Sequence, residues 1–400
     1  MQQYHSYIIG FLATAALIYF LRSRAAYFGL IDSPCKRKQH SGNIPLIGGL
    51  AIFCGFIFAS FTLDEPLVDL YTFLAACLTV IVVGVLDDVF DLSTWIRFVA
   101  QIAAALIMSL WGGVILLDLG VLSFDGSLFS LGILAIPFTV FATVGVINTL
   151  NMSDGLDGLS GALTLSALSG LIVVAYTANA YVELNVLLLL TSCIVAFLFF
   201  NLRHPLRKQA SIFMGDAGSM FIGFSLTWFF IKLSQGEQRA MPPVAALWFI
   251  ALPLFDTVGI MFRRIIKGRS PFLADREHFH HILLLAGCSV AQSVAIMTVL
   301  SLIGVAIGLT GIYLEIPDII MFALFLAMFS VYYWGMMHTW KVMRFLSRSI
   351  CRRRNDKDRR VNTTRRISNI TPETERRVSL DRRSPVDRRS YADLRGFSGK

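Results

Sequence analysis

The chain has 400 residues, of which 56% are hydrophobic and only 15% are charged. This composition excludes an ordinary soluble domain and favours a protein built from membrane-spanning helices. The formal net charge of +9 is concentrated toward the C-terminus, so it describes the tail more than the apolar remainder of the chain.

Apolar windows recur along most of the chain, and most approach the roughly 20 residues that a helix needs to cross a bilayer. We therefore predict an all-α polytopic membrane protein with about eleven transmembrane helices. The first window lacks a preceding basic segment and an obvious cleavage site, which indicates a retained anchor rather than a signal peptide. The predicted spans are residues 6–21, 46–63, 68–86, 98–117, 130–147, 160–176, 184–201, 213–231, 244–262, 290–312 and 317–340.

Lys and Arg collect in alternate loops, at residues 22–45, 202–212 and 263–289, whereas the loops between them are mainly acidic. Because basic loops tend to stay in the cytoplasm, eleven spans place the N-terminus outside and the C-terminus inside. We expect residues 1–345 to form the membrane domain. Residues 346–400 carry repeated arginine pairs and few apolar residues, which predicts a disordered cytoplasmic tail that contacts anionic lipids. Nucleic-acid binding is not expected, because the tail has no aromatic platform.

The polar clusters that could carry chemistry fall at the predicted cytoplasmic ends of the spans. A transporter is expected to place such groups near the middle of the membrane, often on broken helices. Their position at span ends therefore favours an enzyme with its active site on the cytoplasmic face. The clusters are residues 87–91, 148–157, 201–216, 256–269 and 278–281.

The first cluster, Asp87-Asp88-Val-Phe-Asp91, ends a predicted span. If the helix continues, Asp87 and Asp91 share one face with Asp88 beside it. Adjacent carboxylates resist full ionisation unless a cation or a proton is present. The motif predicts a metal site or a general base, and a solvated helix cap is the alternative.

The second cluster spaces Asn148, Asn151, Asp154 and Asp157 three residues apart, so on a helix they would fall near one face. Oxygen ligands of this kind suit Mg²⁺ or Mn²⁺, and the glycines between them would let a substrate approach the backbone. We therefore predict metal and substrate contacts here. The alternative is a polar helix cap followed by a glycine turn.

The remaining clusters combine aromatic, acidic and basic side chains. Asn201 precedes Phe213-Met-Gly-Asp216-Ala-Gly-Ser219, where a carboxylate between glycines suits metal binding and Phe213 suits base stacking; a capped helix start is the alternative. A second set predicts phosphate contacts in preference to a zinc site. Its members are Arg264, His278, His280 and His281, with Lys38 and His40 as a phosphate-attracting entrance that could equally be an ordinary basic anchor.

These motifs, in this order, resemble those of the polyprenyl-phosphate N-acetylhexosamine-1-phosphate transferases. These are polytopic phosphoglycosyltransferases, and they include the MurNAc-pentapeptide translocase. The resemblance covers about residues 1–345, and the segment from Arg263 to His281 is similar to the bacterial GlcNAc-1-phosphate transferase branch. Phe279 departs from that branch, which often has an aliphatic residue at this place.

The resemblance implies transfer of GlcNAc-1-phosphate from UDP-GlcNAc to undecaprenyl phosphate at the bacterial cytoplasmic (inner) membrane, with release of UMP. The product would initiate O-antigen, common antigen or another envelope glycan. The resemblance also implies roles for individual residues. Asp216, with Asp154 nearby, would hold Mg²⁺ or Mn²⁺; Asp87, the suggested base, and Asp88 would lie by the lipid phosphate; Asn201, Phe213 and Asp157 would form the uridine pocket; Arg264, His278, His280 and His281 would hold the diphosphate and sugar.

Several alternatives stay open at this point. The donor could carry GalNAc, FucNAc, QuiNAc or MurNAc-pentapeptide, and a homodimer is not decided. An aromatic prenyltransferase shares the Asp-rich motif but has no need of the Gly-Asp-Ala-Gly-Ser segment. A CDP-alcohol phosphotransferase would need an Ala-Arg that is missing after Asp154-Gly155. A non-enzymatic lipid transporter is the hypothesis from a different class, and it would release no UMP.

Overall fold

The computed structural model describes residues 4–32, 42–204, 207, 209–268, 270 and 278–338. These residues are mostly helical, with one short antiparallel strand pair, β1 (Ile31–Asp32) and β2 (Ile44–Pro45). The helices are α1 (Tyr4–Arg22), α2 (Gly48–Ser60), α3 (Leu70–Phe90), α4 (Thr94–Leu110), α5 (Ala135–Ser153, preceded by the 3₁₀ turn Gly132–Leu134), α6 (Leu159–Thr177), α7 (Tyr181–Asn201), α8 (Gly215–Ser234), α9 (Pro243–Phe249), α10 (Ala251–Ile266), α11 (Phe279–Leu285), α12 (Val290–Tyr313) and α13 (Asp318–Met337).

Eight of these helices are long and apolar enough to cross a membrane, and α9 with α10, bent by 82°, would make a ninth crossing. The chain is therefore a multi-pass membrane protein. Two predicted spans are shorter than expected, because α2 has 13 residues and α4 has 17. At 1.5 Å per residue these helices are about 20 and 26 Å long, against a hydrocarbon core of about 30 Å. The prediction of eleven full spans is thus not confirmed.

The end of α4 has a local cause. The span was predicted to reach residue 117, but the helix stops at Leu110, just before Gly112 and Gly113. Gly113 has a φ of +61°, a left-handed conformation that glycine adopts without steric cost. The chain then leaves the helix and forms an irregular loop that reaches α5.

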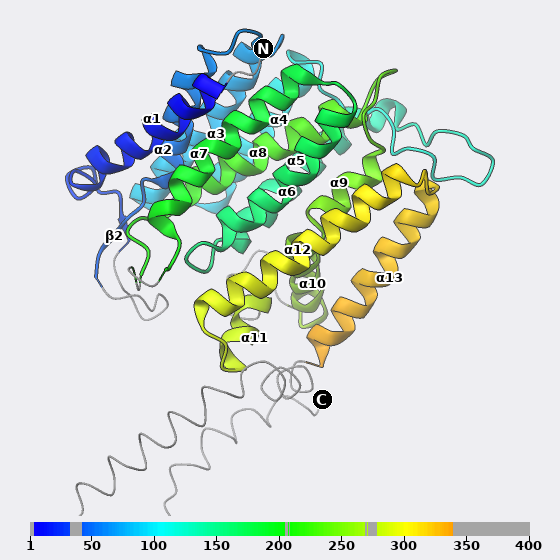
Figure 1. Cartoon of the computed structure of the whole chain (residues 1–400). Coiled ribbons are helices and arrows are strands. Elements are labelled where there is room, and N and C mark those ends of the chain that lie inside the picture. Colours follow the sequence, from blue (N-terminus) through cyan, green and yellow to red (C-terminus); the bar gives the residue numbers. More distant parts are fainter. Residues whose placement is uncertain are drawn as a thin grey trace, which may run out of the picture. The chain divides into compact units, whose positions relative to one another are not determined.

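Helix α8 lies at the centre of the helix bundle, packed against α2, α3 and α5 (Figure 1). Of its best membrane-spanning window, 94% is buried, a far larger share than in α1 or α13. A helix that is apolar on all sides is expected in such a central place. Because α2, α3 and α5 pack against α8, residues at the ends of these helices are brought close to the ends of α8.

Glycines let α2 and α3 contact the backbone at the beginning of α8. A Cβ atom on Gly49 would lie 2.1 Å from the backbone nitrogen of Gly218, and one on Gly84 would lie 2.3 Å from Cα of Ala217. Both contacts are too short for any larger residue. The first turn of α8 is therefore held in place by the backbones of α2 and α3.

Candidate active site

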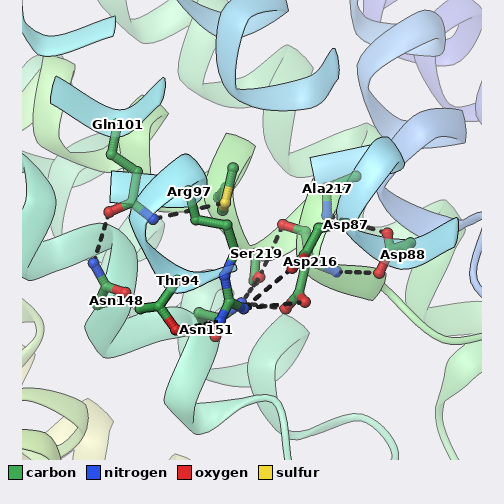
Figure 2. Close-up of polar contacts among 11 residues, drawn as sticks. Asp87, Asp88, Thr94, Arg97, Gln101, Asn148, Asn151, Asp216, Ala217 and Ser219 are labelled. Carbon is green, nitrogen blue, oxygen red and sulfur yellow. Dashed lines mark hydrogen bonds and ion pairs between the residues drawn. The ribbon is translucent and has the colours of Figure 1, made fainter. Parts of the chain in front are cut away.

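Polar side chains from four helices meet at the N-terminal end of α8 (Figure 2). They come from the last turn of α3, the first turn of α4, the last turn of α5 and the first turn of α8. The residues are Asp87 and Asp88 on α3, Arg97 on α4, Asn151 on α5, and Asp216 and Ser219 on α8.

Arg97 joins the two acidic motifs. Its Nη1 lies 3.1 Å from Oδ2 of Asp87 and 3.5 Å from Oδ2 of Asp216. The other oxygen of Asp87, Oδ1, is buried and has no hydrogen-bond partner among the described residues. A buried oxygen of this kind needs a proton, a cation or a donor from a ligand. Arg97 was not expected from the sequence, and its signal would have been a lone cation shortly after the Asp87-Asp88 motif.

Asp88 binds the beginning of α8 rather than pointing into open space. Its Oδ1 accepts a hydrogen bond from the backbone N–H of Asp216 at 2.8 Å, and its Oδ2 accepts one from Ala217 at 3.3 Å. Gly215 has a φ of +74°, and a Cβ there would lie 2.5 Å from Oδ2 of Asp88. The carboxylate thus satisfies N–H groups that a helix N-terminus leaves free, and it positions Asp216.

The two asparagines of α5 have different partners. Asn151 donates through Nδ2 to Oδ1 of Asp216 and to Oγ of Ser219, the latter at 2.9 Å. Asn148 lies one turn away and donates to Oε1 of Gln101 at 2.7 Å. Asn151 is therefore part of the Asp216 cluster, whereas Asn148 ties α5 to α4.

The expectation that Asn148, Asn151, Asp154 and Asp157 share one helix face is wrong, because α5 ends at Ser153. Asp154 and Asp157 lie in the turn before α6, which contains Gly158 with a φ of +84°. Helix α3 likewise ends at Phe90, and Asp91 adopts a left-handed φ of +50°, so Asp91 does not continue the face of Asp87.

The side chain of Asp154 reaches solvent in this turn, but protein atoms are packed closely around it. The water that this packing displaces raises the pKa of Asp154 to about 7, and the negative charges of Asp216 and Asp157 act in the same direction. A hydrogen bond with Ser160 opposes the rise. This mutual influence indicates that Asp154 and Asp216 belong to one electrostatic environment.

Asp157 and Asn201 bind the loop between α7 and α8. Oδ2 of Asp157 lies 2.6 Å from Nε of Arg203 and also accepts the N–H of Ala210. Asn201 is buried, and its amide accepts from the N–H of Gly158 at 2.7 Å and donates to the carbonyl of Ile212 at 2.8 Å. Both side chains therefore position the segment that leads to Phe213.

Phe213 itself is half-buried, and its backbone joins β2. Its N–H donates to the carbonyl of Pro45 at 2.8 Å, and its carbonyl accepts from Gly48 at 2.9 Å. The beginning of α2 is thereby fastened to the segment before α8. A contact of Asn201 or Phe213 with a nucleotide stays a prediction.

The histidine motif lies against the turn that follows α5. His278 donates through Nδ1 to Oδ2 of Asp256 on α10 at 2.8 Å. His280 is buried, and a Cβ on Gly155 would lie 2.4 Å from its Nε2, so the ring touches the residue after Asp154. Arg264 is also buried, in the last turn of α10. Asp256 begins the predicted cluster 256–269 but was given no role there, and it lies about two turns before Arg264 on the same helix.

The pKa of His280 is lowered to about 3, chiefly because burial disfavours the imidazolium and secondly because His281 and His278 lie close by. His280 is therefore neutral at pH 7. Its Nδ1 has no hydrogen-bond partner within the described residues.

Two sets of predicted residues need separate mention. Lys38 and His40 lie outside the described residues, as do residues 346–400.

Within the described part of the chain, no group of three or more His, Cys, Asp or Glu side chains could hold a metal ion. Mg²⁺ is usually held by only one or two carboxylates, with waters and substrate phosphates completing its shell. Asp216 lies in the same cluster as the unpartnered Oδ1 of Asp87 and is close enough to Asp154 to influence its charge, and such a set fits that mode of binding.

The fold and site together define a multi-pass membrane protein with carboxylates and amides gathered at the N-terminus of a central helix and histidines packed against the turn after α5. Residues 70–234 match the family described as glycosyl transferase family 4. The chain is also 35% identical over 356 residues to an undecaprenyl-phosphate alpha-N-acetylglucosaminyl 1-phosphate transferase of Escherichia coli K12, covering 89% of this chain and 96% of that protein.

Proteins of the same name in Yersinia pestis and Haemophilus influenzae are similarly close. The first is 36% identical over 84% of this chain and 92% of its own length, and the second is 35% identical over 86% and 96%. The chain therefore belongs to glycosyl transferase family 4, in the group of these sugar 1-phosphate transferases.

Proposed function

We propose that this protein transfers N-acetylglucosamine 1-phosphate from UDP-GlcNAc to undecaprenyl phosphate and releases UMP. The observation that carries the proposal is the meeting of Asp87, Arg97, Asn151 and Asp216 at one helix end in a chain so similar to transferases of that name. The lipid-linked product would initiate O-antigen, common antigen or another envelope glycan.

We assign Asp216, with Asp154 nearby, to the binding of Mg²⁺, with Mn²⁺ as a substitute. Such a cation, when bound, would neutralise the donor diphosphate and stabilise the charge that develops on the departing UMP. Asn151 would hold the Asp216 carboxylate in one orientation, since its amide donates to Oδ1. Asp88 would act indirectly, because its oxygens fix the first turn of α8.

The remaining charged groups suit the two phosphates that react. Asp87 and Arg97 would face the lipid phosphate. Asp87 would be the candidate base, and Arg97 would be the cation that offsets the negative charge of the phosphate. A lipid phosphate is already largely ionised near pH 7, so direct in-line attack on the β-phosphorus needs little help from a base. Arg264 and the three histidines of residues 278–281 would contact the diphosphate and sugar.

Asp157, Asn201 and Phe213 would form the uridine side of the site. The polar atoms of Asp157 and Asn201 are largely hydrogen-bonded to backbone groups and to Arg203. We therefore expect them to shape the loop that presents Phe213, and we expect Phe213 to stack on the base.

We also propose that the site faces the cytoplasm, with eleven crossings, the N-terminus outside and the enzyme in the bacterial inner membrane. In support, the helix ends on the side of the site include the end of α1, the end of α7 and the end of α10, and the sequence that follows each of them contains a basic cluster. The short helices α2 and α4 would count as two of the crossings.

The first test is release of UMP by purified protein supplied with UDP-GlcNAc, undecaprenyl phosphate and Mg²⁺. We expect UMP together with a lipid whose mass corresponds to undecaprenyl diphosphate-GlcNAc. Chelation with EDTA should abolish both products, and added Mg²⁺ or Mn²⁺ should restore them. Asp216→Asn should lose UMP release by at least a hundredfold while the protein still purifies as a folded species. A protein that moves the lipid and yields no UMP would instead be a transporter.

The donor sugar needs a separate test, because related chemistry could use UDP-GalNAc, UDP-FucNAc, UDP-QuiNAc or UDP-MurNAc-pentapeptide. The names of the similar proteins favour GlcNAc. Competition among these donors at equal concentration, followed by mass analysis of the lipid product, should give GlcNAc as the main transferred sugar. A different dominant product would identify another donor sugar and would leave the proposed class of reaction unchanged.

A further inference from the structure

The carboxylate of Asp256 joins the histidine motif to the last helix of the described chain. It is 2% exposed and lies on α10. Its Oδ1 accepts hydrogen bonds from the hydroxyl of Tyr332 on α13 at 2.8 Å and from the N–H of Phe279 at 2.9 Å. Its Oδ2 contacts Nδ1 of His278 at 2.8 Å. Three segments far apart in sequence thus meet at one carboxylate.

This arrangement selects one form of the His278 ring. An ionised carboxylate can only accept, so Nδ1 of His278 must carry the hydrogen. Nε2 is then the polar atom of the ring that is left for another partner. The ring also lies nearly parallel to that of His280, with centroids 5.5 Å apart and planes inclined by 10°. Both its rotation and its tautomer are therefore constrained.

The Tyr332 hydroxyl contributes a constraint that the His278 contact alone does not give. The N–H of Phe279 also binds Oδ1, but it belongs to the residue after His278 and moves with that histidine. Tyr332 binds Oδ1 from a separate helix, so it ties the plane of the carboxylate to α13. The ring of Tyr332 packs edge-on against Phe279, with centroids 6.1 Å apart, and lies 5.8 Å from the ring of Phe255. The hydroxyl is thus carried to Asp256 by a ring whose own position is set by packing.

We propose that Tyr332 is a positioning residue of the active site. Through Asp256 it holds His278 so that Nε2 of the ring faces the phosphate groups of the UDP-sugar. The nature of that anion rests on the proposed function, whereas the hydrogen-bonded chain from Tyr332 to His278 does not. Helix α13 contributes little buried surface elsewhere, with 17% of its spanning window buried, and through this chain it becomes part of the site.

The adjacent residue supplies a matched control. Tyr333 also carries a buried hydroxyl, and that hydroxyl has no hydrogen-bond partner in the described part of the chain. Tyr332→Phe and Tyr333→Phe each remove a single oxygen from neighbouring tyrosines and retain the ring. We expect Tyr332→Phe to lower kcat/KM for UDP-GlcNAc about tenfold, the lower end of the loss usual for a group that orients an active residue. Tyr333→Phe should stay within twofold of the unaltered protein.

A double-mutant cycle separates positioning from a general structural effect. If Tyr332 acts through His278, Tyr332→Phe should cause less than a twofold further loss in a His278→Gln background. A full tenfold loss there, or equal losses in Tyr332→Phe and Tyr333→Phe, would overturn the proposal. A sensitive radiolabelled assay is needed, because His278→Gln will itself be slow.

A spectroscopic measurement decides the question without any activity. In protein labelled with ¹⁵N-histidine, the Nδ1-bound proton of His278 is identified by its loss in His278→Gln. We expect this signal to shift in Tyr332→Phe and to be unchanged in Tyr333→Phe, and an unchanged signal in both would contradict the proposal. Should the unaltered protein release no UMP and the signal still shift, the proposed function fails and the positioning role stands.

Discussion

Arg97 is the cation that the two acidic motifs share, so it is the residue on which a single substitution should be most informative. Its Nη1 lies within 3.5 Å of both Asp87 and Asp216. Arg97→Met should lower kcat/KM for UMP release on the order of a hundredfold, because the carboxylates then repel one another and the phosphates lose a donor. Arg97→Lys should retain part of the activity, since it keeps the charge but not the planar fork.

Arg239→Met is the matched control for Arg97. Arg239 binds both oxygens of Asp118, at 3.0 and 3.1 Å, beyond the C-terminal end of α8. That end is about 30 Å from Asp216, given the length of the helix. Arg239→Met should therefore leave turnover near that of the unaltered protein and affect only thermal stability. Equal loss of turnover in both variants would show that Arg97 acts through folding.

His280 should make the stability of the protein depend on pH in the acidic range. Its pKa is about 3 when folded and 6.5 in the unfolded chain, so below pH 6.5 the unfolded state binds a proton that the folded state does not. The contribution of neutral His280 to the free energy of unfolding is thus complete above pH 6.5. It falls as the pH is lowered toward 3, by at most about 1.4 kcal/mol per pH unit. Apparent Tm in detergent between pH 7 and pH 4 should fall less steeply in His280→Gln. An equal slope in the unaltered protein and in His280→Gln would show that this histidine is not the cause.

At the scale of helices, the close approach of α2 to α8 holds Asp216 in place. A Cβ on Gly49 would lie 2.1 Å from the backbone nitrogen of Gly218, which no side-chain rotation can relieve. We expect Gly49→Ala to lower Tm by several degrees and to reduce turnover strongly, because the first turn of α8 must move. Gly145→Ala on α5, where nothing lies within 4 Å of the added atom, should be tolerated. Similar losses in both variants would rule out the close contact as the cause.

The helix ends also explain what the sequence could and could not predict. Local patterns located Asp87, Asn151, Asp216 and the histidines, because each lies in a short motif beside an apolar span. Helix α5 was predicted to carry Asp154 as well, although the two Asp-Gly pairs that follow Ser153 are ordinary turn signals. Arg97 was not expected at the site, and Asp256 was counted in the cluster 256–269 without a role, for another reason. Their importance comes from partners on other helices, and no local spacing records such a pairing.

At the scale of the whole molecule, the orientation in the membrane is the main expectation still to be tested. Val68 and Phe124 lie in loops at the end of the bundle away from Asp216, and they are 93% and 94% exposed. Ile266, 69% exposed, ends α10 on the side of the site. Each can be replaced by cysteine, one at a time, in a cysteine-free background that still releases UMP.

If basic loops face the cytoplasm, a membrane-impermeant maleimide added to intact cells should label Val68→Cys and Phe124→Cys at once. Ile266→Cys should react only after the cells are permeabilised. The opposite pattern would place the site outside, where neither UDP-sugars nor the cytoplasmic pool of Mg²⁺ would reach it. Labelling of all three in intact cells would mean that the two ends of the bundle do not lie on opposite sides of the membrane, and the proposed orientation would then fail.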